Sequence, residues 1–253
     1  MKSLEKMIGI LDLFEDAEME WTPEAMAERL DLTRSTLYRY LKVLADAGLL
    51  TSLPGVGYTL GPRIAELDFR MRRSDPLITA SRPVMAELIG EVPGIALLCR
   101  RYRGLVLCVH QEASRGIGFR SAYERGSARP LLRGAASTSI LAHLPAAVLR
   151  KHYENAPQDF AEAGLGADLD AVRAHLRAIR QRGVSVTKGD VAPGVTGVGA
   201  PIFDSKGGVV GSLSVTIGEP DLAPERLAFV SERISSGAAI VTKAIAREPD
   251  AHI

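Results

Sequence analysis

The chain has 253 residues, of which 46% are hydrophobic but only 5% aromatic, and its 31 basic and 30 acidic side chains give a formal charge of +1. These values suit one large or two smaller globular domains with aliphatic cores. They give no overall reason to expect an anionic membrane or nucleic acid as partner, and no run of about 18 apolar residues could span a bilayer. Charged residues interrupt residues 1–14, which excludes a secretory signal, so we expect a cytoplasmic protein.

Three helices and a hairpin are predicted in residues 1–61. The first helix is expected from Lys2 to Glu15, with Leu4, Ile8, Leu11 and Phe14 facing inward. Thr22 and Pro23 are typical of a helix start and open the second helix, "PEAMAERL", which should bury Met26, Ala27 and Leu30. Thr33 can cap the third helix, and Gly48 can end it in a left-handed conformation.

The third helix has two contrasting faces. Leu37, Leu41 and Leu44 recur at helical spacing and predict a buried stripe. The other face is polar and basic, and its candidate DNA-contacting residues are Arg34, Ser35, Thr36, Tyr38, Arg39 and Lys42. Arginine, lysine and hydroxyl side chains of this kind bond to phosphates and base edges. An ordinary solvated helix face is the alternative interpretation of the same residues.

A hairpin, "LLTSLPGVGYTLG", follows with a Pro-Gly turn and a second strand from Tyr58 to Leu60. The order of elements is that of a winged helix-turn-helix, in which the third helix enters the major groove. Residues 1–73 nevertheless carry 10 basic and 12 acidic side chains. This balance favours the alternative of a sensor or scaffold whose winged helix binds protein instead of DNA.

The chain resembles the IclR-type transcriptional regulators over nearly its whole length. In the first domain the pattern is carried by Thr36, Arg39, Leu41, Leu44, Gly48 and Leu49, and by Tyr58, Leu60 and Gly61 in the wing. Further on, "RGAASTSILAHLP" resembles the segment beside the family's effector pocket, and "PGVTGVGAPIFDSKGGVVGSLSVT" resembles its closing strands. The resemblance adds Tyr58 to the expected DNA-binding residues and implies a double-stranded DNA operator as partner.

From the residues we expect a linker helix, "PRIAELDFRMRRS", with Ile64, Leu67 and Met71 inward, and then an α+β body. Helices are predicted at "PVMAELIGEV", "DLDAVRAHLRAIRQRG" and from Pro224 to about Ala246. Strands are predicted at "GIALLCRRY", "LVLCVHQEA", "GAPIF" and "VVGSLSVTI". The resemblance implies an antiparallel, GAF-like effector domain, and a linker helix that joins two chains into a dimer and further into a dimer of dimers.

The cysteines and histidines show no pattern of catalysis or metal binding. Cys99 and Cys108 are expected to face each other as reduced thiols across a hairpin, with a redox pair as the less favoured alternative. The five histidines lack metal-ligand spacing, and no nucleophile elbow, P-loop or dinucleotide motif occurs. The sequence therefore predicts no catalytic residues, no metal site and no cofactor.

A ligand site is predicted around "RGAAST". Several arginines precede it between Arg115 and Arg133, Glu124 is the only acid there, and free N–H groups at a helix start suit a carboxylate. Ser137 and Thr138 are expected to add hydroxyl donors. A tightly packed Gly/Ala helix with an arginine-decorated loop is the alternative interpretation.

The family's pocket, carried over to this chain, implies that Arg129, Ala135 and Ala136 form one wall, Thr187 and Gly197 a capping region, and Ser214 and Thr216 the last strand. The full set of expected effector-binding residues is Arg129, Leu131, Arg133, Gly134, Ala135, Ala136, Thr187, Asp190, Gly197, Ser214 and Thr216. Thr187 and Gly197 stand where the family often has an acid and can have a cysteine, so the identity of the ligand does not transfer. We expect a small organic acid, aromatic acids included, held by one arginine and by hydroxyls over an apolar floor.

The sequence thus predicts a ligand-responsive DNA-binding regulator. Its expected parts are a winged helix-turn-helix at 1–61, a linker helix at 62–75 and an effector-binding domain at 76–248.

Overall fold

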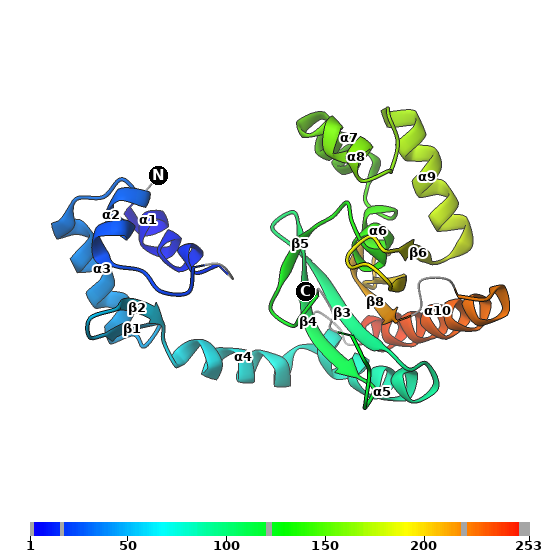
Figure 1. The fold of residues 1–253 in the computed structure, drawn as a ribbon, viewed down its shortest axis with the longest axis horizontal. Helices are drawn as coiled ribbons and strands as arrows, with labels where there is room; N and C mark the ends of the chain where they lie inside the picture. Colours follow the sequence, from blue (N-terminus) through cyan, green and yellow to red (C-terminus); the bar gives the residue numbers. More distant parts are fainter. Residues whose placement is uncertain (1–2, 16–17, 120–122, 219–221, 248–253) are drawn as a thin grey trace. The chain divides into compact units, whose positions relative to one another are not determined.

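The computed structural model describes residues 3–15, 18–119, 123–218 and 222–247, and the chain forms two compact units, Met1–Ser74 and Asp75–Ile253. The first unit contains α1 (Ser3–Gly9), a 3-10 turn η1 (Leu11–Leu13), α2 (Pro23–Arg29), α3 (Arg34–Asp46), β1 (Leu50–Leu53), β2 (Gly57–Leu60) and α4 (Arg63–Ser74). Figure 1 shows this order along the chain, and α4 occupies the predicted linker.

The first helix is shorter than predicted. It ends at Gly9, and Leu4 and Ile8, which were expected inside, are exposed by 72% and 45%. Ile10 fills the core instead, while Leu11 and Phe14 are half-buried against it. The tighter 3-10 turn that follows has three residues per turn, so a period of 3.6 does not carry across the break.

The predicted start and inner face of α3 are confirmed. The Thr33 hydroxyl accepts a hydrogen bond from the Thr36 N–H at 3.4 Å, and Leu37, Leu41 and Leu44 are buried. Beyond the helix, Gly48 has φ +72°, the left-handed conformation expected there. Helix α3 therefore has a capped start and a leucine face that is buried in the core.

Two backbone hydrogen bonds join the wing to Trp21, which lies just before α2. The Trp21 N–H donates to the Tyr58 carbonyl at 3.0 Å, and the Tyr58 N–H donates back to the Trp21 carbonyl at 2.8 Å. Gly57 permits this approach, because a Cβ there would lie 2.3 Å from the Trp21 oxygen. Thr22 caps α2 as predicted. Three residues of this helix were expected to be buried: Met26 is buried, whereas Ala27 and Leu30 are half-buried.

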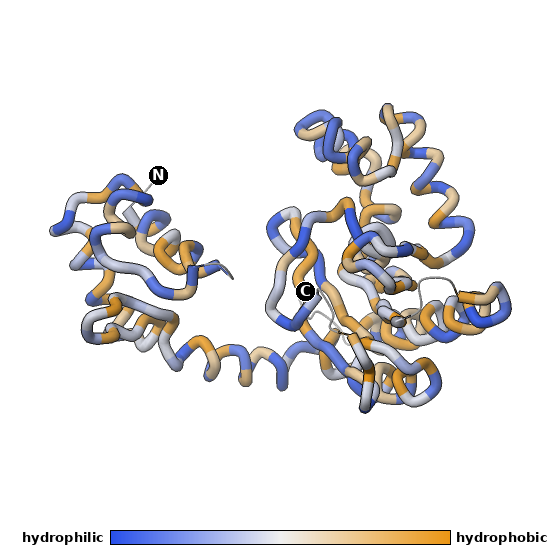
Figure 2. Tube along the Cα trace, viewed as in Figure 1, coloured by the Kyte–Doolittle hydropathy of each residue, from blue (hydrophilic) through white to orange (hydrophobic). Residues whose placement is uncertain are grey.

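Helix α4 buries no residue within the described chain, which contradicts the inward stripe predicted for it. Ile64 is half-buried, while Leu67 and Met71 are exposed by 41% and 45%. Figure 2 shows hydrophobic and hydrophilic residues alternating along this helix. The periodicity correctly identified the helix, but none of its apolar side chains is fully buried among the residues that the structure describes.

The second unit is built on one antiparallel sheet of six strands, in the order β5-β4-β3-β8-β7-β6. The strands are β3 (Ile95–Tyr102), β4 (Leu105–Ala113), β5 (Ala128–Pro130), β6 (Ser185–Lys188), β7 (Thr196–Phe203) and β8 (Val209–Ile217). The helices are α5 (Pro76–Glu91), α6 (Ala135–Leu141), α7 (Ala146–Asn155), α8 (Pro157–Glu162), α9 (Leu169–Arg182) and α10 (Pro224–Ala246). The expected α+β class with an antiparallel sheet is confirmed.

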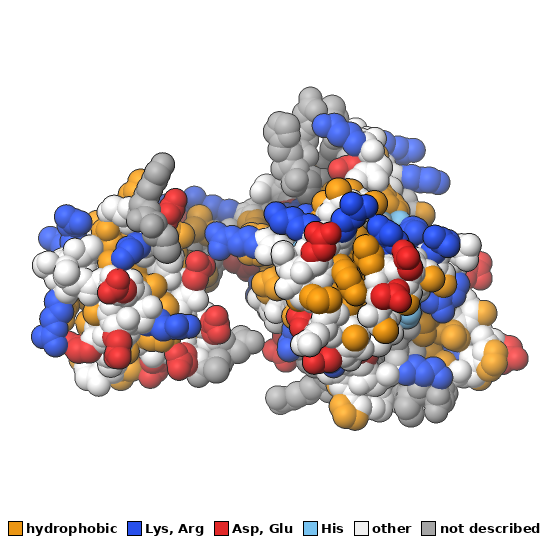
Figure 3. All heavy atoms as spheres, turned by 90° about the horizontal axis from the view of Figure 1, so that it is seen from above, with side chains coloured by type: hydrophobic (Ala, Val, Ile, Leu, Met, Phe, Trp, Pro, Cys, Tyr) orange, Lys and Arg blue, Asp and Glu red, His pale blue; other side chains and the backbone are white. Residues whose placement is uncertain are grey.

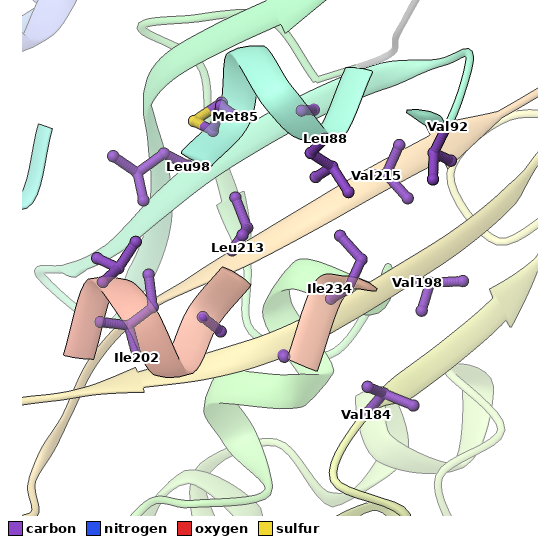
Figure 4. Close-up of a cluster of buried hydrophobic side chains, with 14 of the residues drawn as sticks. Met85, Leu88, Val92, Leu98, Val184, Val198, Ile202, Leu213, Val215 and Ile234 are labelled. Carbon is purple, nitrogen blue, oxygen red and sulfur yellow. The ribbon is translucent and has the colours of Figure 1, made fainter. Parts of the chain in front are cut away.

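Two apolar clusters cover the two faces of this sheet. Helices α5 and α10 pack on one face, where Figure 4 shows Leu88 and Ile234 directed toward Val215 of β8. On the other face α6 packs on β7 and β8 and also contacts β3 and β6, and α9 packs on α6. Val172, Leu176 and Ile179 of α9 are buried in the apolar cluster of this face. No helix in the described part of the chain is long and apolar enough to cross a bilayer.

Cys99 and Cys108 lie opposite each other on β3 and β4, as predicted, and both are free and buried. A hydrogen bond to the Cys108 thiol, followed by burial, raises the pKa of Cys99 well above its ordinary value. Cys99 is therefore held as a neutral thiol within the core.

Candidate functional site

The outer face of α3 is open in its own unit. Arg34, Ser35, Tyr38, Arg39 and Lys42 are exposed, and the guanidinium of Arg39 lies 5.5 Å from the centre of the Tyr40 ring. Figure 3 shows basic side chains gathered at the left edge of the smaller unit and several acidic ones along its lower edge. Basic side chains therefore gather locally on this face, even though acids outnumber bases in the unit as a whole.

Two of the expected DNA-contacting residues are less open. Thr36 is half-buried, and its hydroxyl accepts a hydrogen bond from the Thr33 hydroxyl at 3.0 Å. Tyr58 is half-buried in β2, where its backbone is bonded to Trp21. The structure therefore presents one compact basic and hydroxyl-bearing face on α3, with Tyr58 in the adjoining wing.

The second unit contains a pocket lined by α6, by strands β3, β6, β7 and β8, and by the loop before β7. Counted out to its open mouth, it holds about 490 Å³ of empty space. Its lining residues come from five stretches of chain: Leu97; Tyr123; Gly134, Ala135 and Ala136; Thr187, Asp190, Val191, Ala192, Val195 and Gly197; and Ser214, Val215 and Thr216. Sequence reasoning proposed Gly134, Ala135, Ala136, Thr187, Asp190, Gly197, Ser214 and Thr216 for this site, and the structure brings them together.

Small residues let α6 approach the sheet closely. A Cβ at Gly199 would lie 2.7 Å from the Ala135 carbonyl oxygen, and one at Gly134 would lie 2.7 Å from a Val191 methyl. At Gly197 an added Cβ would lie 3.0 Å from the Thr187 hydroxyl oxygen. A side chain at Gly197 would therefore narrow the pocket.

The polar groups of α6 are largely satisfied within the protein. Asp190 accepts a hydrogen bond from the Gly134 N–H at 2.5 Å, so a carboxylate of the chain itself already occupies part of the helix start. The Ser137 hydroxyl bonds to the Tyr123 hydroxyl at 3.0 Å, and the Thr138 hydroxyl donates to the Gly134 carbonyl at 2.9 Å. Ser137 and Thr138 are thus structural, contrary to their expected role as ligand donors.

The arginines predicted around the pocket do not line it. Arg129 and Arg133 are exposed, and Leu131 is buried in the cluster beneath α6. Arg133 donates to the Glu162 carbonyl at 3.5 Å, which directs it toward α8. Arg120, also in the predicted arginine run, lies outside the described residues.

The sequence analysis did not predict the aliphatic lining residues Leu97, Val191, Ala192, Val195 and Val215, nor the aromatic one, Tyr123. It is only 4% exposed and lines the pocket, and the guanidinium of Arg129 lies 5.7 Å from the centre of its ring. Burial raises the pKa of its hydroxyl well above the ordinary value, so the group is neutral. Arg129 therefore borders the site through the tyrosine ring and not by direct contact with the cavity.

What the pocket can do chemically follows from its lining. Apolar side chains and a tyrosine ring make most of the wall, with hydroxyls on Thr187, Ser214 and Thr216 and one carboxylate on Asp190. Within the described ranges, no group of three or more His, Cys, Asp or Glu side chains could hold a metal ion. The arrangement suits reversible binding of a small molecule with a few polar groups.

Comparison with protein families agrees with this architecture. Residues 70–242 match the model "Bacterial transcriptional regulator IclR C-terminal", and residues 3–54 match "IclR helix-turn-helix domain". The chain belongs to the IclR family of transcriptional regulators. Its helix-turn-helix unit is the DNA-binding part and its second unit the effector domain of such a regulator.

Individual relatives of this IclR-family regulator match along its whole length. The transcriptional regulator KipR of Bacillus subtilis is 24% identical over 250 residues, covering 96% of this chain and 97% of the relative. An IclR regulator structure from Alicyclobacillus acidocaldarius has a TM-score of 0.81 at 22% identity, covering 96% and 98% of the two chains. An IclR homologue from Microbacterium hydrocarbonoxydans, solved with 4-hydroxybenzoate, has a TM-score of 0.77 at 21% identity, covering 98% and 100%.

Proposed function

We propose that this IclR-family regulator acts in the cytoplasm as a self-associating repressor or activator that reads an operator through α3. Its effector is a small organic acid that carries a hydroxyl group, bound in the pocket beneath the loop that contains Asp190. The observation that carries the proposal is the pairing of an open basic helix face in one unit with a part-polar pocket in the other.

The polar groups of the pocket favour a ligand that has a carboxylate at one end and a hydroxyl at the other. On β8, Ser214 and Thr216 offer hydroxyl donors, which suit a carboxylate. In the loop before β7, Asp190 uses one carboxylate oxygen for Gly134 and can accept further hydrogen bonds, which suits a ligand hydroxyl. A carboxylate placed beside Asp190 would be repelled, so the two ends of the ligand are distinguished.

The remaining wall is mostly apolar, which favours an aromatic ring in the ligand. Leu97, Val191 and Val195 are aliphatic, and the Tyr123 ring adds an aromatic surface at the same cavity. The Microbacterium homologue is complexed with 4-hydroxybenzoate, which has a ring, a carboxylate and a hydroxyl. This chemistry agrees with the class of ligand that the present pocket favours.

Binding of the effector would act on the DNA-binding unit by favouring one arrangement of the assembly over another. Coupling between two sites in one protein typically amounts to about 1–3 kcal/mol, or roughly 5–150-fold in affinity. We expect a change of this size in operator affinity when the effector is bound.

A thermal-shift series on the full chain tests the effector class, because a ligand that binds only the folded state raises the melting temperature. The probes are 4-hydroxybenzoate, benzoate and phenol, compared in the native protein and in Asp190→Asn, whose amide oxygen still accepts from Gly134. We expect 4-hydroxybenzoate to give the largest shift, and its advantage over benzoate to shrink in Asp190→Asn. If benzoate and 4-hydroxybenzoate gave equal shifts in melting temperature, the proposed role of the ligand hydroxyl would be wrong. If neither acid gave a shift, the proposal of an organic acid as effector would be refuted.

A further inference from the structure

A second concave site lies in the effector unit, at the end of the sheet where β3 turns into β4 and β8 begins. It is lined by Arg100, Arg101, Arg103, Gly104, Val209 and Val210, and we call it the arginine groove. Counted out to its open mouth, it contains about 710 Å³ of space. None of these residues lines the effector pocket, so the two sites are separate.

The lining of the arginine groove is basic, with three arginines and no acidic side chain among its residues. The carboxylates beside it are those of Asp75, which pairs with Arg100, and Asp204, which accepts a hydrogen bond from the Gly208 N–H at 2.8 Å. A Cβ added at Gly104 would lie 3.9 Å from His152 Cε1, which places the tip of the hairpin against α7. Burial, and then the charges of Arg101 and Lys151, lower the pKa of His152, which shows that both cations act on this imidazole.

The arginines of the groove differ in how far they are neutralised. Arg100 forms a two-point ion pair with Asp75, with Nη1–Oδ2 and Nη2–Oδ1 distances of 2.9 and 3.1 Å. Arg101 is exposed and makes no ion pair with any residue that the structure describes. Arg101 therefore contributes an uncompensated charge to the groove.

The hairpin turn holds Arg103 in an unfavourable backbone conformation. Tyr102 pairs with Leu105, so the turn consists of Arg103 and Gly104 alone, with φ values of +47° and +81°. Turns of this kind favour Asn-Gly, because asparagine tolerates the left-handed region far better than arginine. Local stability does not explain an arginine here, and strain of this sort is frequent at binding sites.

We propose that the arginine groove binds a small oxyanion with two or more negative charges, such as a phosphate ester or pyrophosphate. The planar guanidinium forms paired, charge-assisted hydrogen bonds to phosphoryl oxygens, and Arg101 and Arg103 both line the groove at this hairpin, where the Arg103 guanidinium also lies 5.3 Å from the centre of the Tyr102 ring. Val209 and Val210 supply an apolar surface for the carbon part of an ester. The effector pocket contains the Asp190 carboxylate and would disfavour the same ligand.

Calorimetric titration of the full chain with pyrophosphate, at constant ionic strength, tests this site. The variants are Arg101→Gln and Arg103→Asn, and the control is Arg177→Gln, which removes an exposed charge from α9. We expect each groove variant to lose affinity by about tenfold or more, and the control to bind as the native protein does. Arg103→Asn should also raise the melting temperature, because the turn favours asparagine.

The outcomes distinguish specific binding of pyrophosphate in the arginine groove from non-specific electrostatic attraction to exposed arginines. Unchanged affinity in Arg101→Gln, an equal loss in Arg177→Gln, or no measurable binding of pyrophosphate by the native protein would each overturn the proposal. A parallel titration with a short DNA duplex of random sequence distinguishes the source of phosphate. If the duplex alone lost affinity in Arg101→Gln, the groove would be assigned to the DNA backbone and the small-anion proposal would fail.

Discussion

At the scale of single residues, α3 combines two tasks within four turns of helix. Leu37 and Leu41 are fully buried, while Arg39 and Lys42 lie exposed on the other side. The apolar stripe fixes the rotation of the helix about its axis, and that rotation determines which cations face outward. The functional face is therefore defined by the core residues as much as by its own side chains.

Arg39→Ala should weaken specific operator binding by about 1–3 kcal/mol if the guanidinium holds a guanine edge. The loss should be confined to the specific site, because phosphate contacts from the rest of α3 remain. A gel-shift titration on a DNA fragment selected from genomic fragments for binding measures it, with Arg177→Ala in the effector unit as control. Equal affinity of native protein and Arg39→Ala would remove this residue from the interface.

In the pocket, Ser214→Ala combined with Thr216→Val should abolish most of the response to the effector while leaving DNA binding intact. The double variant removes two hydroxyls from the wall and changes its volume little, so the sheet should keep its register. Net hydrogen bonds of this kind contribute about 0.5–1.5 kcal/mol each, and more to a charged ligand. Calorimetry with the acid that gives the largest thermal shift measures the loss; retention of full affinity would place the ligand elsewhere.

At the scale of helices and strands, the predictions from sequence were most accurate where all the signals for an element lie within one short segment. Helix α3 carries its cap, its stripe and its terminating glycine within one short segment, and all three are confirmed. The predicted length and inner face of the first helix were wrong, because the helix ends at Gly9 and a 3-10 turn with a different period follows. Nothing in the apolar pattern marks that change. Strand pairing between β3 and β4 was predictable because a tight turn connects them.

The pocket could be predicted only in part, because its walls come from distant segments. Resemblance to the family located Ala135, Thr187 and Ser214, which no periodicity would have joined. The run of arginines before α6 was misleading, since composition does not tell which way a side chain points, and Arg129 turns out to be exposed. Tyr123 was missed because its role depends on its contact with Ser137 on α6.

The contact between α6 and the sheet gives a prediction at the level of elements. In Gly199→Ala the new methyl would lie 2.7 Å from the Ala135 carbonyl, so α6 must shift away from β7. Overpacking of this kind typically costs about 1–3 kcal/mol, and the displaced helix should also lower effector affinity.

The matched control for this variant is Gly90→Ala in α5, where nothing lies within 4 Å of an added Cβ. It should stabilise the protein by about 0.5–1 kcal/mol, since alanine is favoured over glycine in a helix. Denaturant unfolding measures both variants. If Gly199→Ala were as stable as the native protein, the close packing of α6 on β7 would not hold in solution.

At the scale of the whole molecule, one α3 helix reads few base pairs, and a two-fold pair reads two half-sites. A dimer is therefore expected, and apolar side chains left uncovered in the monomer indicate where its contact lies. Within the described residues, α4 buries none of its side chains, although Ile64, Leu67 and Met71 form an apolar stripe. The failure of the predicted inward stripe is thus informative, because the stripe can be covered by a second chain.

We expect Leu67→Lys to shift the protein from dimer toward monomer, because a buried ammonium without a partner strongly disfavours an apolar contact. Ala65→Lys is the matched control: it adds the same charge to the same exposed helix, but on the opposite side from Leu67. Sedimentation velocity across a concentration series measures the mass of each variant. The Leu67 variant should also lose affinity for a two-half-site operator while each monomer keeps its weak binding to one half-site. If both lysine variants sedimented as the native protein does, the stripe on α4 would lie outside the dimer contact, and the coupling of effector and operator would have to pass through another surface.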